Sequence, residues 1–234
     1  MALYTIADLH LPLGINKPME VFGKAWSGYV ERLEYNWQRK ITPADTVIIP
    51  GDFSWATYLE QSEKDFEFLN RLNGKKILLK GNHDYWWSTI SKLESFIKKN
   101  GFEDIHFLQN NSFRYGNITI CGTRGWLSPS LESFSAEDRK IYSREILRLE
   151  LSLKSADNNG EIYVFTHYPP ILPQYYNNDF VKMMKNYNVT KCFYGHLHSA
   201  SHKNAVNSII DGIEYRLISA DYLQFDPYKI DISV

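Results

Sequence analysis

Short apolar runs of β-type residues recur along this chain, and five of them end in a small polar cluster. The clusters are Asp8-Leu9-His10, Gly51-Asp52, Gly81-Asn82-His83-Asp84, His167 and Gly195-His196-Leu197-His198. They hold most of the chain's 7 histidines. Open α/β sheets collect their ligands at the carboxyl ends of their strands, so this order predicts one site built from several strand ends.

Amphipathic stretches separate the β-type runs, and together they predict an α/β fold. Strands are expected at residues 3–7, 46–49, 76–79, 105–108, 117–121, 162–166, 191–194, 206–210, 214–218 and 229–232. Helices are expected at residues 19–39, 57–72, 88–100, 136–155 and 179–186. No repeat, low-complexity tract or polar linker interrupts the chain. We therefore expect a single domain over residues 1–234.

Three local signals refine this outline. Ser135 is the expected N-cap of the fourth helix, with Asp138 three residues further on. Asp211-Gly212 separates two alternating runs and predicts a two-residue hairpin. Cys121 and Cys192 each lie in an expected strand, which indicates buried free thiols rather than a disulfide or a metal site.

The composition of the 234 residues excludes several classes of protein. Hydrophobic residues make up 44% and charged residues 23%, which is typical of a globular protein and excludes a disordered one. The formal net charge is -1, so no excess of positive charge attracts long nucleic acids or anionic membranes. No apolar run reaches the roughly 18 residues of a membrane span. The N-terminus lacks the pattern of a signal peptide, and we expect a cytoplasmic protein.

Each polar cluster alone is a weak signal. Asp-x-His and Gly-Asp occur in ordinary solvated turns, and a lone histidine at a strand end is usually structural. Gly-Asn-His-Asp is rarer, and Gly-His-x-His is a fair metal-binding pattern. The ordered set, with each member directly after a β-type run, is far more specific than any one of them.

This ordered set resembles the motif series of the calcineurin-like metallophosphoesterase superfamily, and the match extends from Asp8 to His198. The resemblance implies a four-layer αββα sandwich, in which helices flank two mixed β-sheets. It also implies two divalent metal ions. The ligands of the first would be Asp8, His10 and His198. The ligands of the second would be Asn82, His167 and His196, and Asp52 would bridge the two ions.

Carboxylate, amide and imidazole ligands suit Mn²⁺, Fe²⁺, Zn²⁺ or Co²⁺ better than Ca²⁺ or Mg²⁺. Two such ions roughly 3.5–4 Å apart can clamp phosphoryl oxygens and lower the pKa of bound water. By this resemblance, a metal-bridging hydroxide would attack the phosphorus of a small phosphoester. His83 is not needed as a ligand, because Asn82 fills that role from the same turn. The His83 imidazole can stabilise the phosphoryl charge or protonate the leaving group, and Asp84 can fix its tautomer.

Details of the motifs indicate which branch of the superfamily the chain resembles. Serine/threonine phosphatases carry Gly-Asp-x-Val-Asp-Arg-Gly and Gly-Asn-His-Glu, whereas here Gly51-Asp52 is followed by Phe-Ser-Trp and the third motif ends in Asp84. Lipid A precursor hydrolases replace the motif histidine with arginine, which His83 argues against. With these branches disfavoured, the chain resembles the broad bacterial group that includes cyclic-nucleotide phosphodiesterases, nucleases and uncharacterised members.

The long loop at residues 123–135 is a candidate binding loop, because long loops in compact domains often line a site. Arg124, at its start, is our candidate for a second phosphate contact, and a surface ion pair is the alternative. Trp126 is a candidate for substrate binding, since aromatic side chains near the clusters can stack on a nucleobase. Core packing is the alternative for many of these aromatic residues.

Our leading hypothesis is a two-metal phosphodiesterase acting on a small, nucleotide-like substrate. A nuclease would need a basic track, yet the lysine pairs at 75–76 and 98–99 are scattered. A phosphomonoesterase also remains an alternative. A non-catalytic interaction domain of the same fold ranks lower, because such relatives lose metal ligands or the motif histidine, whereas here every position is filled. The sequence leaves the native metals and the oligomeric state open.

Overall fold

The structure is a computed structural model that describes residues 1–157 and 160–232. The chain forms two compact units. Unit 1 contains residues 1–107 and the C-terminal stretch that begins at Ile218, and unit 2 contains Leu108–Leu217. The assignment of one domain to residues 1–234 stays a prediction.

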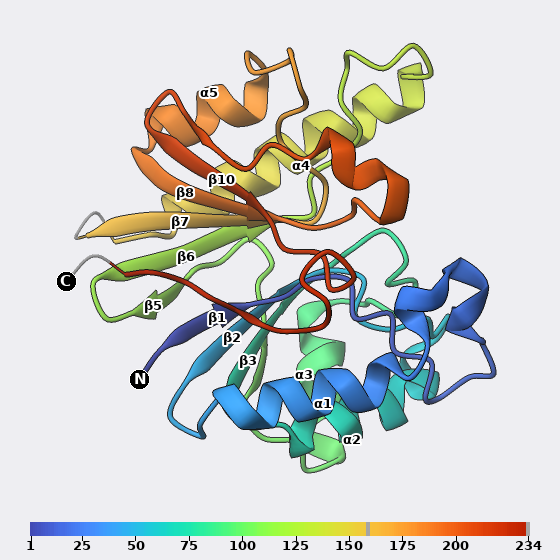
Figure 1. The fold of residues 1–234 in the computed structure, drawn as a ribbon. Helices are drawn as coiled ribbons and strands as arrows, with labels where there is room; N and C mark the ends of the chain where they lie inside the picture. The colour runs from blue at the N-terminus through green and yellow to red at the C-terminus, as the bar shows by residue number, and fades with distance from the viewer. Residues whose placement is uncertain (158–159, 233–234) are drawn as a thin grey trace. The chain divides into compact units, whose positions relative to one another are not determined.

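Unit 1 is built on a mixed five-stranded sheet with the order β11-β1-β2-β3-β4. The strands are β1 (Leu3–Thr5), β2 (Thr46–Pro50), β3 (Lys75–Leu79), β4 (Ile105–Phe107) and β11 (Tyr228–Lys229). Strands β1 to β4 run parallel, and β11 pairs with β1 in the antiparallel sense. Helices α1 (Tyr29–Lys40), α2 (Glu63–Arg71) and α3 (Ile90–Lys99) cover one face of this sheet (Figure 1).

Two predicted helices of unit 1 are shorter than expected. The stretch at 19–39 contains two 3₁₀ turns, η1 (Met19–Phe22) and η2 (Lys24–Trp26), before α1 begins. Gly23 (φ 122°) and Gly28 (φ 57°) interrupt it, because a positive φ cannot continue a right-handed helix. The stretch at 57–72 likewise opens with the 3₁₀ turn η3 (Leu59–Ser62) before α2.

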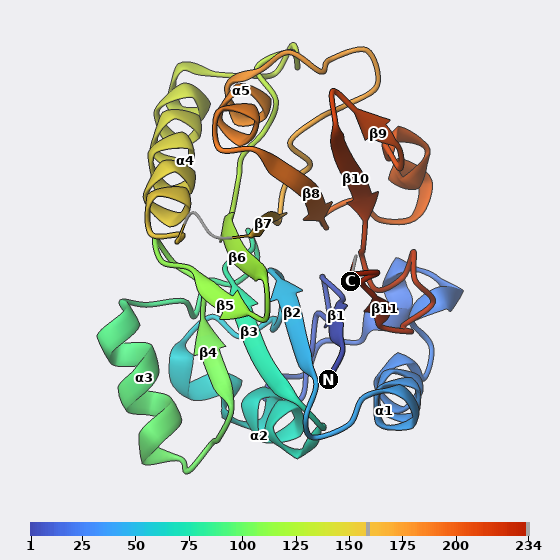
Figure 2. The same ribbon diagram turned by 90° about the vertical axis from the view of Figure 1, so that its left-hand side faces the viewer.

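Unit 2 contains a mixed six-stranded sheet with the order β5-β6-β7-β8-β10-β9. Its strands are β5 (Phe113–Tyr115), β6 (Ile118–Thr123), β7 (Glu161–Thr166), β8 (Val189–Tyr194), β9 (Ile209–Ile210) and β10 (Ile213–Leu217). The four central strands run parallel, and the two edge strands are antiparallel. Helices α4 (Ala136–Lys154) and α5 (Asp179–Asn186) lie on one face (Figure 2), and the 3₁₀ helix η4 (Ser199–Asn204) follows β8. Two mixed sheets with helices confirm the predicted α/β class.

The N-cap and the hairpin turn predicted for unit 2 are both confirmed. The Asp138 amide donates to Ser135 Oγ at 3.1 Å, and the Ser135 amide donates back to Asp138 Oδ2 at 2.9 Å, which makes the predicted cap. In the β9–β10 hairpin, Asp211 (φ 51°) and Gly212 (φ 84°) both adopt the left-handed conformation that a type I′ turn requires. The short strand β5 was not predicted, and β9 covers only the last part of the expected run at 206–210.

Both cysteines are buried and free, as predicted. Burial raises the pKa of the Cys121 thiol to about 12 and also raises that of Cys192, so neither is a reactive thiolate at neutral pH. Among the helices of residues 1–157 and 160–232, none has both the length and the hydropathy of a membrane-crossing segment.

Candidate active site

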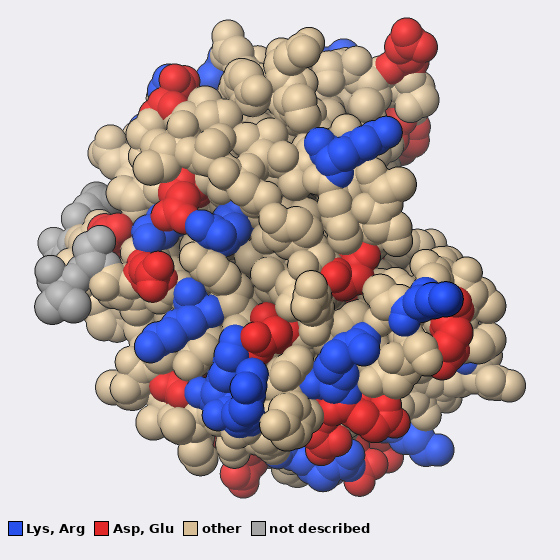
Figure 3. All heavy atoms as spheres, viewed as in Figure 1, with Lys and Arg blue, Asp and Glu red and all other residues tan. Residues whose placement is uncertain are grey.

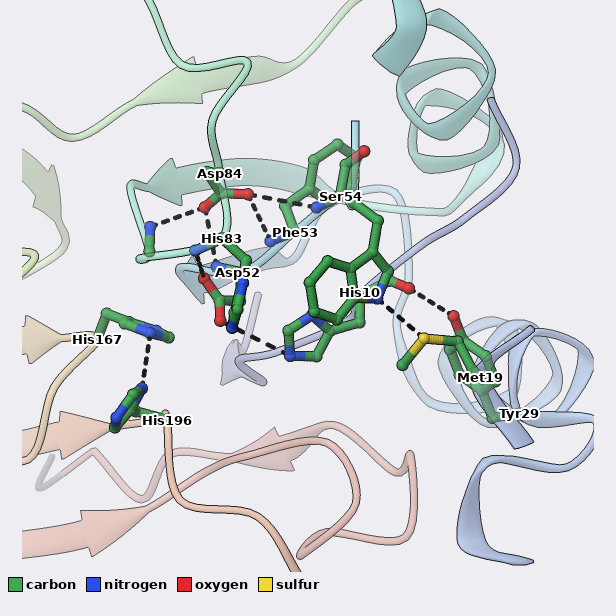
Figure 4. Close-up of polar contacts among 12 residues, drawn as sticks. His10, Met19, Tyr29, Asp52, Phe53, Ser54, His83, Asp84, His167 and His196 are labelled. Atoms are coloured by element: carbon green, nitrogen blue, oxygen red, sulfur yellow. Dashed lines mark hydrogen bonds and ion pairs between the residues drawn. The ribbon is translucent and has the colours of Figure 1, made fainter. Parts of the chain in front are cut away.

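Three loops of unit 1 leave the carboxyl ends of β1, β2 and β3, and they carry the predicted motif residues. Backbone hydrogen bonds hold the first two loops side by side, because the Asp8 amide donates to the Gly51 carbonyl and the His10 amide donates to the Asp52 carbonyl, both at 2.9 Å. The parallel pairing therefore continues beyond the strands and brings His10 next to Asp52. His10 Nε2 lies 3.7 Å from Asp52 Oδ2 (Figure 4).

Asp8, His10 and Asp52 each offer a potential ligand atom to the same small region. A carboxylate oxygen of Asp8 lies within 4.8 Å of a His10 ring nitrogen and of a carboxylate oxygen of Asp52. The three residues are 0%, 3% and 1% exposed. Two buried carboxylates at this separation repel each other unless a cation neutralises them. The donor set therefore fits a divalent metal ion bound by oxygen and imidazole.

These three residues also share an uncommon backbone conformation. The φ angles are 62° at Asp8, 47° at His10 and 52° at Asp52, all in the left-handed region. A residue other than glycine held there costs about 1–3 kcal/mol, and such strain clusters at functional sites. The strain occurs where each loop turns away from its strand, which is also where the side chains converge.

The third loop approaches Asp52 so closely that only glycine fits at position 81. A Cβ atom on Gly81 would lie 2.1 Å from Asp52 Oδ1 and 2.2 Å from the Asp52 amide nitrogen. Asn82 and His83 follow in the same turn, and both are partly buried. The His83 amide donates to Asp52 Oδ1 at 2.8 Å, so this turn fixes one oxygen of the Asp52 carboxylate.

Asp84 is a fully buried carboxylate that ties the second and third loops together (Figure 4). Its oxygens accept hydrogen bonds from the backbone amides of Gly81 (2.7 Å), Asp52 (2.9 Å), Phe53 (2.9 Å) and Ser54 (3.3 Å) and from the Trp86 indole (3.0 Å). Asp84 therefore positions the turn that carries Asp52. A direct role of Asp84 in fixing the His83 imidazole stays a prediction.

Trp55 forms an aromatic wall beside the histidines of unit 1. Its ring stacks on His10 with centroids 4.6 Å apart and lies 4.5 Å from the His83 ring. The indole N–H donates to Met19 Sδ at 2.9 Å, and the Tyr29 hydroxyl donates to the His10 carbonyl at 2.6 Å. These contacts place Trp55 against the motif histidines of unit 1.

Asp65, on α2, is a further buried carboxylate, and it was not predicted from the sequence. It accepts hydrogen bonds from the Leu13 amide at 2.8 Å and from Ser54 Oγ at 2.5 Å, so it links the loops that follow β1 and β2. Burial raises the pKa of Asp65 to about 7. An acidic residue beside Phe66 and Leu69 on the apolar face of a helix was the available signal.

We expect Asp65→Asn to remove part of the pH dependence of stability. The pKa of Asp65 is raised from 3.8 to about 7 in the folded state, so the unfolded chain loses this proton first as the pH rises. The free energy of unfolding of the native protein should therefore fall between about pH 4 and pH 7 and level off above that range. Relative to Asp65→Asn, the fall should amount to about 3–4 kcal/mol.

Urea unfolding of both proteins at several pH values between 4 and 8 measures this difference. Glu67→Gln, at an exposed position of the same helix, is the matched control and should parallel the native protein. Identical pH profiles for Asp65→Asn and the native protein would contradict the expectation.

In unit 2, the loops after β7 and β8 carry the three remaining predicted histidines. His196 Nδ1 lies 3.3 Å from His167 Nε2 (Figure 4), and the Gly195 amide donates to the His167 carbonyl at 3.1 Å. His167 is fully buried, and His196 has a φ of 72°. His198 precedes η4, and its amide donates to Ser201 Oγ at 2.8 Å. Two imidazole nitrogens this close are suited to holding a metal ion or a shared proton.

Arg124 contacts His167 through its backbone, and Trp126 packs on Tyr168, the residue after His167. The amides of His167 and Tyr168 both donate to the Arg124 carbonyl. The Tyr168 ring lies 4.1 Å from the His196 ring and 5.2 Å from that of Trp126. The loop that begins at Arg124 therefore packs against the loop that follows β7.

The Arg124 side chain forms an ion pair, which was the alternative in the sequence analysis. Its Nη2 lies 3.2 Å from Oε1 of the buried Glu145, and its guanidinium lies 4.4 Å from the Trp126 ring centroid. The Trp126 indole donates to Asp138 at 3.0 Å, at the N-terminus of α4. Contact of Arg124 or Trp126 with a substrate stays a prediction.

A comparison of the sequence with models of protein families identifies the family of this chain. The model for calcineurin-like phosphoesterases matches residues 1–200. The chain belongs to the calcineurin-like phosphoesterase family. This calcineurin-like phosphoesterase is therefore a metal-dependent hydrolase of phosphoric esters, and the resemblance seen in the motifs is confirmed.

Solved structures extend the comparison to the fold of this calcineurin-like phosphoesterase. The phosphopantetheinyl hydrolase of Mycobacterium tuberculosis is 14% identical, with a TM-score of 0.58, and the match covers 99% of this chain and 96% of that one. A protein of unknown function from Aquifex aeolicus is 18% identical, with a TM-score of 0.51, and the match covers 97% and 95% of the two chains. At these identities the likeness shows a shared fold. No curated protein matched the chain.

Proposed function

We propose that this calcineurin-like phosphoesterase is a cytoplasmic phosphodiesterase that hydrolyses a small, nucleotide-like phosphodiester with two divalent metal ions. The observation that carries the proposal is the buried group of Asp8, His10 and Asp52 in unit 1, whose donor atoms suit a divalent cation. We assign one ion to Asp8, His10 and His198. We assign the other to Asn82, His167 and His196, with Asp52 shared by both.

In this proposal, the metal ions supply the positive charge that polarises the phosphoryl group and lowers the pKa of bound water. The protein's own contribution begins with Asp52, whose carboxylate is fixed by the His83 amide and by the close approach of Gly81. The His83 imidazole, beside Trp55, donates a proton to a phosphoryl oxygen or to the departing alkoxide. Asp84 holds the turn on which this geometry depends.

The motif differences from the serine/threonine phosphatases support a diester rather than a phosphoprotein substrate. A nuclease has less support, because the formal net charge is -1. On the face shown in Figure 3, Lys and Arg lie interspersed with Asp and Glu and form no continuous basic track. For the metals we propose Mn²⁺, Fe²⁺, Zn²⁺ or Co²⁺.

We expect chelation to abolish turnover and one of these divalent ions to restore it. The metal-free protein should hydrolyse bis-p-nitrophenyl phosphate at least about 100-fold more slowly than the reloaded one, since the metals supply most of the charge stabilisation. With the best metal, kcat/KM for the diester should exceed that for p-nitrophenyl phosphate. A preference for the monoester would replace the phosphodiesterase assignment with a phosphomonoesterase, and no metal-dependent turnover of either would contradict the proposal.

We expect Arg124→Ala to raise KM about tenfold while changing kcat little, because a charged hydrogen bond to a bound phosphate contributes about 1.5–3 kcal/mol. Glu145 is also paired with Arg148 at 2.6 Å, so Arg148→Ala is the matched control: it removes the other partner of the same carboxylate. Steady-state kinetics on the diester separate the two variants. An unchanged KM in Arg124→Ala, or equal changes in both variants, would end the assignment of Arg124 to the substrate.

A further inference from the structure

Lys17 lies in the segment between the first motif loop and α1, and its ammonium group rests on the indole of Trp55. The Lys17 Nζ atom is 2.9 Å from the Trp55 ring centroid and 5.7 Å from that of Phe22. Within residues 1–157 and 160–232, Lys17 makes no ion pair with a carboxylate. The π face of an aromatic ring attracts a cation, which holds the side chain in place without neutralising its charge.

The indole that carries Lys17 is the one that touches the motif histidines. Trp55 stacks on His10 and also contacts His83, and the Met19 thioether fixes its N–H. These residues all belong to unit 1. A single ring therefore connects the Lys17 ammonium with the two histidines that the proposed function assigns to metal binding and proton donation.

Lys17 keeps an unneutralised positive charge beside Trp55. Partial burial lowers the pKa of Lys17, which shows that part of its hydration is lost, and a poorly hydrated ammonium attracts an anion more strongly than one in bulk water. Lys17 also lines a surface cavity of about 330 Å³, together with Glu20 and Glu31. Those two carboxylates disfavour an anion in the cavity.

We propose that Lys17 binds a second phosphate of the substrate, next to the scissile phosphodiester, and thereby selects substrates that carry two phosphates. The inference rests on the proposed function, because the scissile phosphate is placed by the metal ions and His83. Trp55 contacts both the Lys17 ammonium and the His83 ring, so the ammonium lies one indole away from His83, where it can meet an anionic group beside the scissile phosphate. Lys17 is in this sense a specificity residue and takes no part in bond cleavage.

A matched pair of chromogenic substrates tests the proposal. Thymidine 5′-(p-nitrophenyl phosphate) and its 3′-phosphorylated form share the scissile bond and the leaving group and differ by one phosphate. The native enzyme should have a kcat/KM about tenfold higher for the doubly phosphorylated compound. Lys17→Met should remove this preference by lowering kcat/KM for that compound alone, and Lys17→Arg should retain most of it.

Lys24→Met is the control, because Lys24 is an exposed lysine in the same segment and lies outside the proposed site. A second measurement needs no turnover and no variant: in calorimetric titrations, thymidine 3′,5′-bisphosphate should bind the native protein about tenfold more tightly than thymidine 5′-phosphate.

Three results would overturn the inference. One is that the native enzyme has the same kcat/KM for the two substrates and also binds the two nucleotides with the same affinity. Another is a Lys17→Met variant that loses activity equally on both substrates. In both cases the metal-dependent hydrolysis itself persists, so the proposed function survives. If the metal-loaded native enzyme hydrolyses neither substrate, nor bis-p-nitrophenyl phosphate, then the proposed function and this inference fail together.

Discussion

Replacing His83 with alanine is expected to lower kcat for the diester by about 10²–10⁴-fold, the usual contribution of a positioned acid or base. The metal content should not change, because the variant removes no proposed ligand. It also keeps the backbone amide that donates to Asp52 Oδ1. Steady-state kinetics and elemental analysis of the purified protein measure the two quantities.

His106→Ala is the control for this experiment, since His106 lies in β4 of the same unit and outside the motif loops. Its kcat should stay within about twofold of the native value, as for most substitutions away from a site. Unchanged turnover in His83→Ala would remove His83 from the mechanism. Loss of metal together with turnover would instead make His83 a ligand.

Replacing Asp84 with asparagine is expected to lower the free energy of unfolding by about 3–5 kcal/mol, the usual cost of breaking a buried charged network. The amide NH₂ group of asparagine would point at N–H donors, because both carboxylate oxygens of Asp84 accept from backbone amides. The turn that carries Asp52 would loosen as a result, so kcat should fall as well. Urea unfolding and diester kinetics measure the two effects.

Asp138→Asn provides the comparison for Asp84, because the Asp138 carboxylate also accepts a backbone amide and a tryptophan N–H but lies at the exposed N-terminus of α4. Its loss should cost only about 1 kcal/mol, as is typical of a helix cap. If Asp84→Asn unfolds like the native protein yet loses turnover, Asp84 acts on the His83 imidazole, as the sequence analysis expected.

Features that depend on residues close together in the chain could be predicted from the sequence. The presence of a strand before each motif loop, the N-cap at Ser135 and the turn at Asp211-Gly212 depend on local sequence, and all three were predicted. The two cysteines were placed correctly because a thiol within an apolar strand is almost always buried.

The contacts that the sequence did not reveal join residues far apart. Lys17 meets Trp55, and Asp65 meets Ser54 and Leu13, only after the loops of unit 1 have folded together. From the sequence, Asp84 was expected to act only on its neighbour His83. In the structure, its carboxylate also accepts hydrogen bonds from backbone amides more than thirty positions away in the chain. The breaks in the stretch at 19–39 depend on the positive φ angles of two glycines, which hydrophobic periodicity does not reveal.

The left-handed backbone at Asp8, His10 and Asp52 has a consequence for anyone who tries to make this protein more robust. Glycine adopts that conformation without steric cost, so a screen that rewards only heat resistance would accept glycine at these positions. The variants selected by such a screen would be more stable proteins without catalytic activity. A selection scheme for this fold therefore has to reward turnover and thermal tolerance in the same round.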